Sequence, residues 1–247
     1  MIVGNPVVYG GVVDAVIFDW GGTLTPWVTS DGRGWWRVVE RLVRAGVVAA
    51  DDADRVGRLL TEAEEAVWRR SREEHRSGTL AEIAAAAGLS ADEVLYAAHA
   101  DEWEQATYLY PDAIDVLTAL RARGLKIGVL SNTAWTRARH EQIFARDGVD
   151  RLLDGAVYTS ELPWTKPHPE AFRAAMAAVG VADPARCVFV GDRPFDDIFG
   201  AGRVGMRTVL VPHSDIPTIQ RGHTQGEPDA VITRLADLPP LVDSWRS

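Results

Sequence analysis

Residues Val13–Thr25 read VDAVIFDWGGTLT, and this stretch decides the fold. An apolar run rich in Val and Ile ends at Asp19, and Gly21 and Gly22 follow within three residues. This pattern is typical of a buried strand that leads into a tight loop. Open α/β sheets bind ligands at the carboxyl ends of their strands, and paired glycines let the backbone approach a bound group closely. On this segment alone, Asp19 is equally well explained as the cap of the next turn.

Three further polar clusters follow apolar runs along the chain. The run Leu125–Leu130 precedes Ser131 and Asn132, the run Gly155–Ser160 precedes Lys166, and the run Cys187–Gly191 precedes Asp192, with Asp196 and Asp197 beyond it. If the strands are parallel, all four clusters gather at one edge of one sheet.

This combination of groups favours phosphoryl chemistry. A carboxylate such as Asp19 can attack phosphorus to form an aspartyl-phosphate. Mg²⁺ held by Asp19 and Asp192 would offset the repulsion between the carboxylate and the phosphate. The remaining groups could hold the phosphate oxygens or neutralise charge: Ser131, the backbone amides of Asn132 and Gly22, and Lys166.

Composition narrows the class of protein. The chain has 247 residues, of which 47% are hydrophobic and 25% charged, as in ordinary globular proteins. The formal net charge of −9 disfavours nucleic acid as a partner. The one cysteine, Cys187, excludes an internal disulfide, which suits a reducing cytoplasm. The first dozen residues do not form a signal peptide, and no apolar stretch is long enough to cross a bilayer.

The periodicity divides the chain into two parts. From Pro111 onward, helical and strand-like segments alternate, which predicts an α/β protein with a doubly wound parallel sheet. Residues 26–107 show helical periodicity without strand-like runs. We therefore expect a core domain of residues 1–25 and 108–247, with a helical domain of residues 26–107 inserted after the first strand. The expected core elements are helices at 113–123, 136–147, 169–179 and 194–203, and strands at 126–130, 156–159, 187–190, 207–211 and 230–233.

The inserted domain carries helix signals of its own. A long helix is expected over 51–75. Capping boxes at Thr79–Glu82 and Ser90–Glu93 predict the starts of two more helices.

Taken in order, the four polar clusters resemble the four motifs of the haloacid dehalogenase-like (HAD) hydrolase superfamily. The motifs are Asp19 with Thr23, Ser131-Asn132, Lys166-Pro167, and Gly191-Asp192 with Asp196-Asp197. The phrases TKPHPEAF and VGDRPFDDIFGA also match, and the resemblance extends from about Val13 to Leu238. The helical insertion resembles the C1 cap of the phosphatase, phosphomutase and dehalogenase branch.

The resemblance implies a Rossmann-like core, a mobile helical lid and an active site between them. It implies that Asp19 is the nucleophile and a Mg²⁺ ligand, together with Asp192 and the backbone carbonyl of Gly21. Lys166 is implied to support the charge, and Asp196 or Asp197 to fix the metal site. The implied phosphate-binding set is Gly22, Thr23, Ser131, Asn132 and Lys166.

One position departs from the phosphatase pattern. Phosphatases of this family have a second aspartate two residues after the nucleophile, which protonates the leaving group and then activates water. This chain has Gly21 there, which has no side chain to carry a proton. Loss of a general acid costs roughly two to four orders of magnitude in rate.

Three hypotheses follow from this departure. The first, which we favour, is a Mg²⁺-dependent phosphatase of a small phosphorylated metabolite, slow or specialised because Gly21 replaces the proton donor. The second is a non-catalytic protein that binds phosphate and metal. The third is a metal-independent 2-haloacid dehalogenase, since such relatives also lack the second aspartate, although they do not keep the pair Gly191-Asp192.

The inserted helices should select the substrate. Trp27, Trp35 and Trp36 follow the first motif and could face the site, and Trp135 follows the second motif. Aromatic residues at helical spacing are more often core residues. The sequence leaves the oligomeric state open, a homodimer included.

Overall fold

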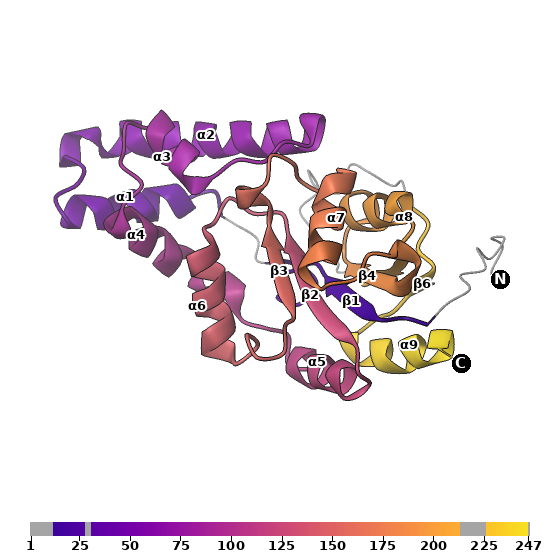
Figure 1. Ribbon diagram of the computed structural model, residues 1–247. Helices are drawn as coiled ribbons and strands as arrows, with labels where there is room; N and C mark the ends of the chain where they lie inside the picture. The colour runs from indigo at the N-terminus through magenta and orange to yellow at the C-terminus, as the bar shows by residue number, and fades with distance from the viewer. Residues whose placement is uncertain (1–11, 28–30, 213–225, 247) are drawn as a thin grey trace.

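The computed structural model describes residues 12–27, 31–212 and 226–246. Its centre is one six-stranded sheet, most of whose strands are labelled in Figure 1. The strands are β1 (Ala15–Phe18), β2 (Lys126–Ser131), β3 (Gly155–Tyr158), β4 (Cys187–Gly191), β5 (Arg207–Leu210) and β6 (Ala230–Val231). Their order is β3-β2-β1-β4-β5-β6, and every neighbouring pair is parallel. The predicted doubly wound sheet is therefore confirmed. Strand order reverses between β1 and β4, and in open parallel sheets the crevice for ligands lies at this switch point.

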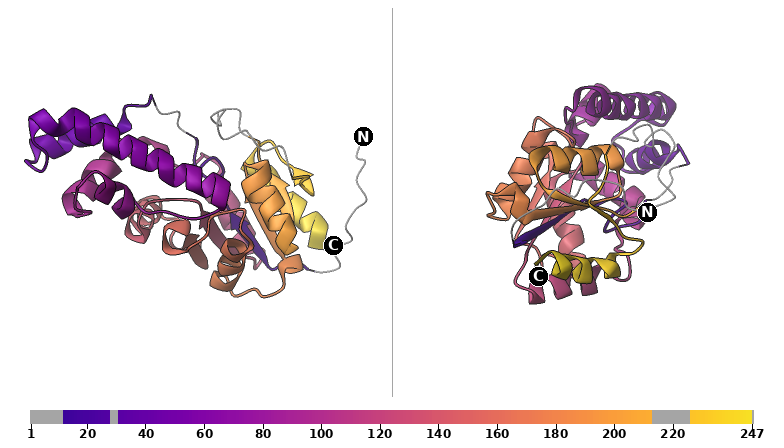
Figure 2. Two further views of the ribbon diagram at one scale, coloured as in Figure 1. Left: turned by 90° about the horizontal axis from the view of Figure 1, so that it is seen from above. Right: turned by 90° about the vertical axis from the view of Figure 1, so that its right-hand side faces the viewer.

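Helices cover both faces of the sheet (Figure 2). One face packs against α5 (Ala113–Ala122), α6 (Arg137–Asp147) and α9 (Leu238–Arg246), and the other against α7 (Pro169–Ala178) and α8 (Gly200–Val204). Alternate residues of β1 serve the two layers: Val16 and Phe18 pack on the α5 side, Ala15 and Ile17 on the α7 side. Burial on both faces explains why the strand sequence is an uninterrupted apolar run. Each large buried side chain contributes about 1.5–3 kcal/mol.

Four helices between β1 and α5 form a second hydrophobic core. They are α1 (Gly34–Arg44), α2 (Ala53–Glu74), α3 (Leu80–Ala86) and α4 (Glu93–Trp103), and they stand together at the left of Figure 1. We call residues 31–107 the helical unit.

Hydrogen bonds tie the end of α2 and the start of α3 to loops of the sheet. The backbone N–H of Thr165 donates to the His75 carbonyl at 2.9 Å, and that of Leu80 donates to the Ala134 carbonyl at 2.8 Å. The carboxyl end of α2 is thereby held beside the loop that carries Lys166.

The capping signals have different outcomes. The Thr79 hydroxyl accepts a hydrogen bond from the Glu82 N–H at 3.1 Å, as the first capping box predicts. The second box places the cap wrongly at Ser90, because Asp92 caps α4 and accepts from the N–H groups of Val94 and Leu95. A carboxylate two residues further along competes successfully for the same orphan N–H groups.

Two helices near the C-terminus differ from the sequence expectation. The helix expected at 194–203 is a π-helical turn, Pro194–Phe199, followed by the short α8. Helix α9 was not among the expected elements. Pro239 and Pro240 both lie in its first turn, where the missing N–H has no helical partner to lose.

The remaining single turns are at Ala50–Asp52, Glu104–Thr107, Thr159–Glu161, Pro184–Arg186 and Leu235–Asp237. None of the helices in the described ranges has the length and apolar character needed to cross a bilayer.

A buried histidine joins the helical unit to the core and gives a prediction about pH. His99 of α4 is 5% exposed and packs against Trp35 and, across the interface, Trp135, at ring distances of 5.2 and 5.8 Å. Burial, aided by the nearby Arg139 charge, lowers the pKa of His99 from 6.5 to about 3. Below pH 6.5 the unfolded chain therefore binds a proton at His99 that the folded chain does not bind. The contribution of neutral His99 to the free energy of unfolding is fully present above pH 6.5 and is lost as the pH falls toward 3.

We expect the free energy of unfolding to fall as the pH decreases from 6 to 4. The slope of this fall should be about 1.4 kcal/mol per pH unit steeper in the native chain than in His99→Gln. Urea unfolding followed by circular dichroism at pH 6, 5 and 4 measures both slopes. Equal slopes would contradict the prediction, whatever the absolute stabilities.

Candidate active site

The loop after β1 holds Asp19 at the sheet's switch point. The Asp19 N–H donates to the Val190 carbonyl of β4 at 2.9 Å, so the strand ladder fixes the backbone up to the carboxylate. The Thr23 hydroxyl donates to Asp19 Oδ2 at 3.4 Å, and Thr23 is fully buried. Thr23 thus orients Asp19 from behind.

Gly22 is required by the geometry of this loop. Its φ of +94° lies in the left-handed region, and a Cβ atom there would lie 2.4 Å from Asp192 Oδ2. The backbone therefore passes directly against the Asp192 carboxylate. Gly21 is different, because a Cβ there would meet only the Trp27 ring, at 3.7 Å, which is ordinary contact.

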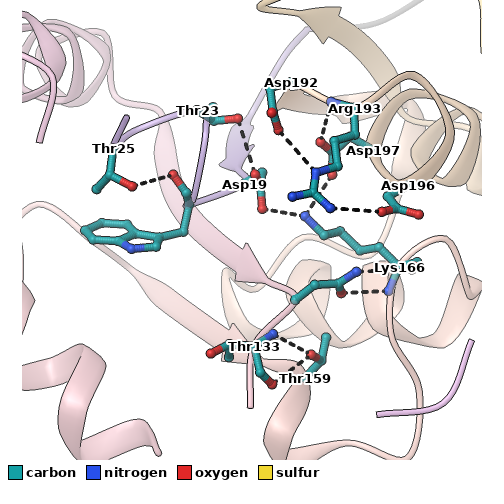
Figure 3. A network of polar contacts seen from close by, with 12 residues as sticks. Asp19, Thr23, Thr25, Thr133, Thr159, Lys166, Asp192, Arg193, Asp196 and Asp197 are labelled. Atoms are coloured by element: carbon teal, nitrogen blue, oxygen red, sulfur yellow. Dashed lines mark hydrogen bonds and ion pairs between the residues drawn. The ribbon is translucent and has the colours of Figure 1, made fainter. Parts of the chain in front are cut away.

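Lys166 lies between two carboxylates (Figure 3). Its Nζ donates to Asp19 Oδ1 at 2.5 Å and to Asp197 Oδ1 at 2.7 Å, and all three side chains are at least 92% buried. Burial opposes the charge on Lys166, yet the two carboxylates raise its pKa above the ordinary value. Burial raises the pKa of Asp197, and Lys166 opposes that rise. Lys166 is therefore a fixed positive charge in contact with the predicted nucleophile.

Asp192 completes a cluster of three carboxylates. One oxygen from each of Asp19, Asp192 and Asp197 lies within 4.8 Å of the other two. Asp192 is 1% exposed, and neither of its oxygens has a hydrogen-bond partner. Burial raises the pKa of Asp192 well above its ordinary value, against the opposing charge of Arg193. An unpartnered buried carboxylate is costly unless it is paired or binds a metal, so the donor set fits a divalent cation.

The two acidic residues after Asp192 separate clearly. Asp197 is fully buried and accepts from the Arg193 N–H at 3.0 Å as well as from Lys166. Asp196 faces the cavity described below and pairs with the Arg193 guanidinium at 3.6 Å. Of the two alternatives left open by the sequence, Asp197 is therefore the one within the cluster.

Asn132 and Ser131 follow β2 and have different neighbours. The Asn132 side chain accepts from the Lys166 N–H at 2.9 Å and donates to the Lys166 carbonyl at 3.2 Å. This pair of bonds fixes the loop that carries the ammonium group. Ser131 is 4% exposed, and with Asn132 it lines the cavity in front of Asp19.

Arg193 is a site residue that sequence reasoning missed. Its Nε lies 4.0 Å from Asp192 Oδ1, its Cζ lies 4.9 Å from the centre of the Trp27 ring, and its side chain is 21% exposed. The sequence carries no signal for a role of Arg193, because only the fold brings it next to Trp27.

A cavity of about 390 Å³ opens in front of Asp19 and Lys166, between the core loops and the helical unit. Trp27 and Trp135 line it, whereas Trp35 is buried and donates to Glu64 Oε2 at 2.8 Å, and Trp36 lies against Gly57. The other aromatic and charged lining residues, except Arg193 and Asp196 described above, are Trp20, Glu64, Trp68, Arg72, Trp103 and His140. Glu64, Trp68 and Arg72 recur every four residues, a helical spacing that could have marked this face of α2.

A family model for haloacid dehalogenase-like hydrolases matches residues 13–205. The chain belongs to this family. All four polar clusters that carry the resemblance lie within the matched residues.

Curated relatives are similar over part of their length. A glyceraldehyde 3-phosphate phosphatase of Methanopyrus kandleri is 32% identical over 133 residues, covering 54% of this chain and 56% of the relative. A phosphoserine phosphatase of Thermus thermophilus is 36% identical over 103 residues, covering 42% and 40%. The chain thus spans about half the length of the curated relatives it matches.

Solved structures share the fold over nearly the whole chain. A HAD phosphatase of Thermococcus onnurineus has a TM-score of 0.64 at 21% identity, covering 95% of this chain and all of the other. An L-2-haloacid dehalogenase of Xanthobacter autotrophicus has a TM-score of 0.60 at 24% identity, covering 94% and 99%. The fold is therefore common to both activities and does not choose between them.

The two adjacent glycines give a matched pair of variants. We expect Gly22→Ala to lower the free energy of unfolding by about 2 kcal/mol or more, because the new Cβ is strained at positive φ and collides with Asp192. Gly21→Ala should change it by less than about 1 kcal/mol. Urea unfolding of both variants checks this, and equal losses would show that the loop does not press on Asp192.

Proposed function

We propose that the protein is a Mg²⁺-dependent phosphatase that hydrolyses a small phosphate monoester through an aspartyl-phosphate on Asp19. The observation that carries this proposal is the buried Lys166 ammonium in contact with both Asp19 and Asp197, beside the unpartnered carboxylate of Asp192. The phosphatase names of the curated relatives support it. In this proposal residues 26–107, which include the helical unit, form a cap over a core of residues 1–25 and 108–247. The protein is proposed to be cytoplasmic.

The metal would be held by Asp19, Asp192 and the Gly21 carbonyl, with Asp197 supporting the site through Lys166. The unpartnered Asp192 oxygens and the 4.8 Å spread of the three carboxylates support this ligand set. When bound, Mg²⁺ supplies positive charge that reduces the repulsion between a phosphate dianion and an attacking carboxylate.

The chain's own groups do the remaining work. Asp19 Oδ2 or Oδ1 attacks phosphorus, and the Lys166 ammonium stabilises the negative charge as it develops. The Ser131 hydroxyl and the backbone N–H groups of Gly22 and Asn132 bind the phosphate oxygens. Thr23 keeps the carboxylate oriented, and water later attacks phosphorus to release Asp19.

Gly21 sets the limits of this activity. A Cβ at position 21 would meet only the Trp27 ring, at 3.7 Å, so the position has room for a side chain but glycine supplies no carboxyl group there. The departing alcohol must take its proton from water or from another side chain, which favours esters with stable leaving groups.

Two other functions are tested by the same assays. A non-catalytic protein would bind phosphate and metal without turnover. A dehalogenase would need no metal; against it stands Asp192, whose buried and unpartnered oxygens call for a cation. The finding that dehalogenases share the fold keeps this candidate in the test.

We expect turnover of 4-nitrophenyl phosphate in the presence of Mg²⁺, reduced at least about 100-fold by EDTA and about 1,000-fold by Asp19→Asn. The good leaving group tolerates a missing acid. Release of nitrophenolate measures the rate. Absence of turnover with measurable phosphate binding would favour the non-catalytic protein, and metal-independent halide release from 2-chloropropionate would favour the dehalogenase.

Restoring the missing carboxyl group gives a second prediction. Gly21→Asp should raise kcat for an alkyl phosphate about 100-fold or more, and for 4-nitrophenyl phosphate much less, because only the alkyl leaving group needs a proton. Gly21→Ala is the control without a carboxyl group. A gain that is equal for both esters, or no gain, would show that the proton donor is not what limits the native chain.

A further inference from the structure

One face of α2 forms a wall of the cavity that changes character along its length. Glu64, Trp68, Ser71 and Arg72 all line the cavity, and their spacing places them on one stripe of the helix. The Ser71 hydroxyl donates to the Thr165 hydroxyl at 3.1 Å, directly before Lys166. The Ser71 end of the stripe is therefore the phosphate end.

Glu64 lies at the other end of this stripe. Seven residues separate it from Ser71, which corresponds to about 10 Å along the helix axis at ~1.5 Å per residue. At one end of the cavity Lys166 and Arg72 accompany the Asp19 carboxylate, and at the other end lies the carboxylate of Glu64.

The walls between these ends are aromatic. Five tryptophans line the cavity: Trp20, Trp27, Trp68, Trp103 and Trp135. A short polar ester would leave most of these rings uncovered. Indole faces favour flat apolar groups and, through their quadrupole, positive charge.

Glu64 has polar neighbours but no cationic partner among the described residues. Its Oε2 accepts from Trp35 Nε1 at 2.8 Å, and Trp68 lines the cavity beside it. Burial raises its pKa, and the neighbouring charge that acts on it is another acid, Glu65. A half-buried carboxylate of this kind gains from a cation supplied by a ligand.

Resting on the proposed phosphatase function, we infer a substrate class for this site: a phosphate monoester whose alcohol part has a flat apolar body and ends in a positively charged nitrogen. The phosphate lies at Asp19 and Lys166, the body lies between the tryptophans, and the ammonium group pairs with Glu64. The hydrogen bond from the Trp35 indole N–H holds the carboxylate in place for that pair.

Binding of two non-hydrolysable probes tests this inference without depending on turnover. The probes are 4-(aminomethyl)benzylphosphonate, which is cationic at pH 7.5, and 4-methylbenzylphosphonate, which has nearly the same shape without the charge. Dissociation constants are measured in Mg²⁺ by calorimetry, with quenching of tryptophan fluorescence as a second signal. We expect the native chain to bind the cationic probe about 10-fold more tightly, a difference of about 1.4 kcal/mol.

Two variants of adjacent residues provide the matched comparison. Glu64→Gln keeps an acceptor for Trp35 but removes the charge, and should reduce the preference to less than about 2-fold while leaving the affinity for the neutral probe unchanged. Glu65→Gln changes the next, exposed residue and should keep the full preference. Trp68→Leu should weaken both probes together.

The outcomes are distinct. A native chain that binds both probes equally overturns the inference, even if no variant folds, and so does a preference that survives Glu64→Gln. With the matching phosphate esters, an equal loss of kcat for both in Glu64→Gln would assign Glu64 to proton transfer instead and would also overturn it. If inorganic phosphate and both phosphonates fail to bind at all, the proposed function itself fails; if they bind without preference, only the substrate class does.

Discussion

The site depends on one buried positive charge. The Lys166 ammonium group holds Asp19 and Asp197 together at 2.5 and 2.7 Å in a region that water barely reaches. Removing one partner from such a buried cluster typically costs about 3–5 kcal/mol, because an uncompensated charge remains. Asn132 fixes the backbone of Lys166 from β2, and Thr23 fixes Asp19 from β1. Four segments that are distant in sequence are thus locked by a single electrostatic arrangement.

The same arrangement leaves the two Asp192 oxygens without a hydrogen bond, and the proposed metal site rests on this imbalance. Lys166 neutralises two of the three carboxylates in part, while Asp192 keeps two buried oxygens with no hydrogen bond. The Nε atom of Arg193 lies 4.0 Å from Asp192 Oδ1, and the guanidinium also stacks over the Trp27 ring. In the proposed function, binding of a divalent cation at Asp192 would therefore stabilise the folded chain.

The helical unit contributes part of the cavity wall. Besides the two chain connections, non-covalent contacts join it to the core. Hydrogen bonds join the end of α2 to the Lys166 loop, and His99 packs on Trp135 across the interface. The residues proposed to bind the phosphate and those proposed to bind the rest of the substrate are therefore held in fixed positions relative to one another. Helix α2 can thus present Arg72 and Glu64, about two turns apart, to the same cavity as Asp19.

The sequence by itself determined the parallel sheet, the position of the helical insertion and the four polar clusters, because these depend on local periodicity and on polar residues at strand ends. It identified Asp19, Ser131, Lys166 and Asp192 as neighbours, since parallel strands leave no other place for their carboxyl ends. Only the tertiary structure chose Asp197 over Asp196, replaced Ser90 by Asp92 as a cap, and revealed α9. It alone brought Arg193 onto Trp27 and placed Glu64 among five tryptophans. The positions of Asp197, Arg193 and Glu64 arise from contacts between segments far apart in the chain, for which the local sequence carries no periodic signal, whereas the cap at Asp92 is a local choice between two neighbouring candidates.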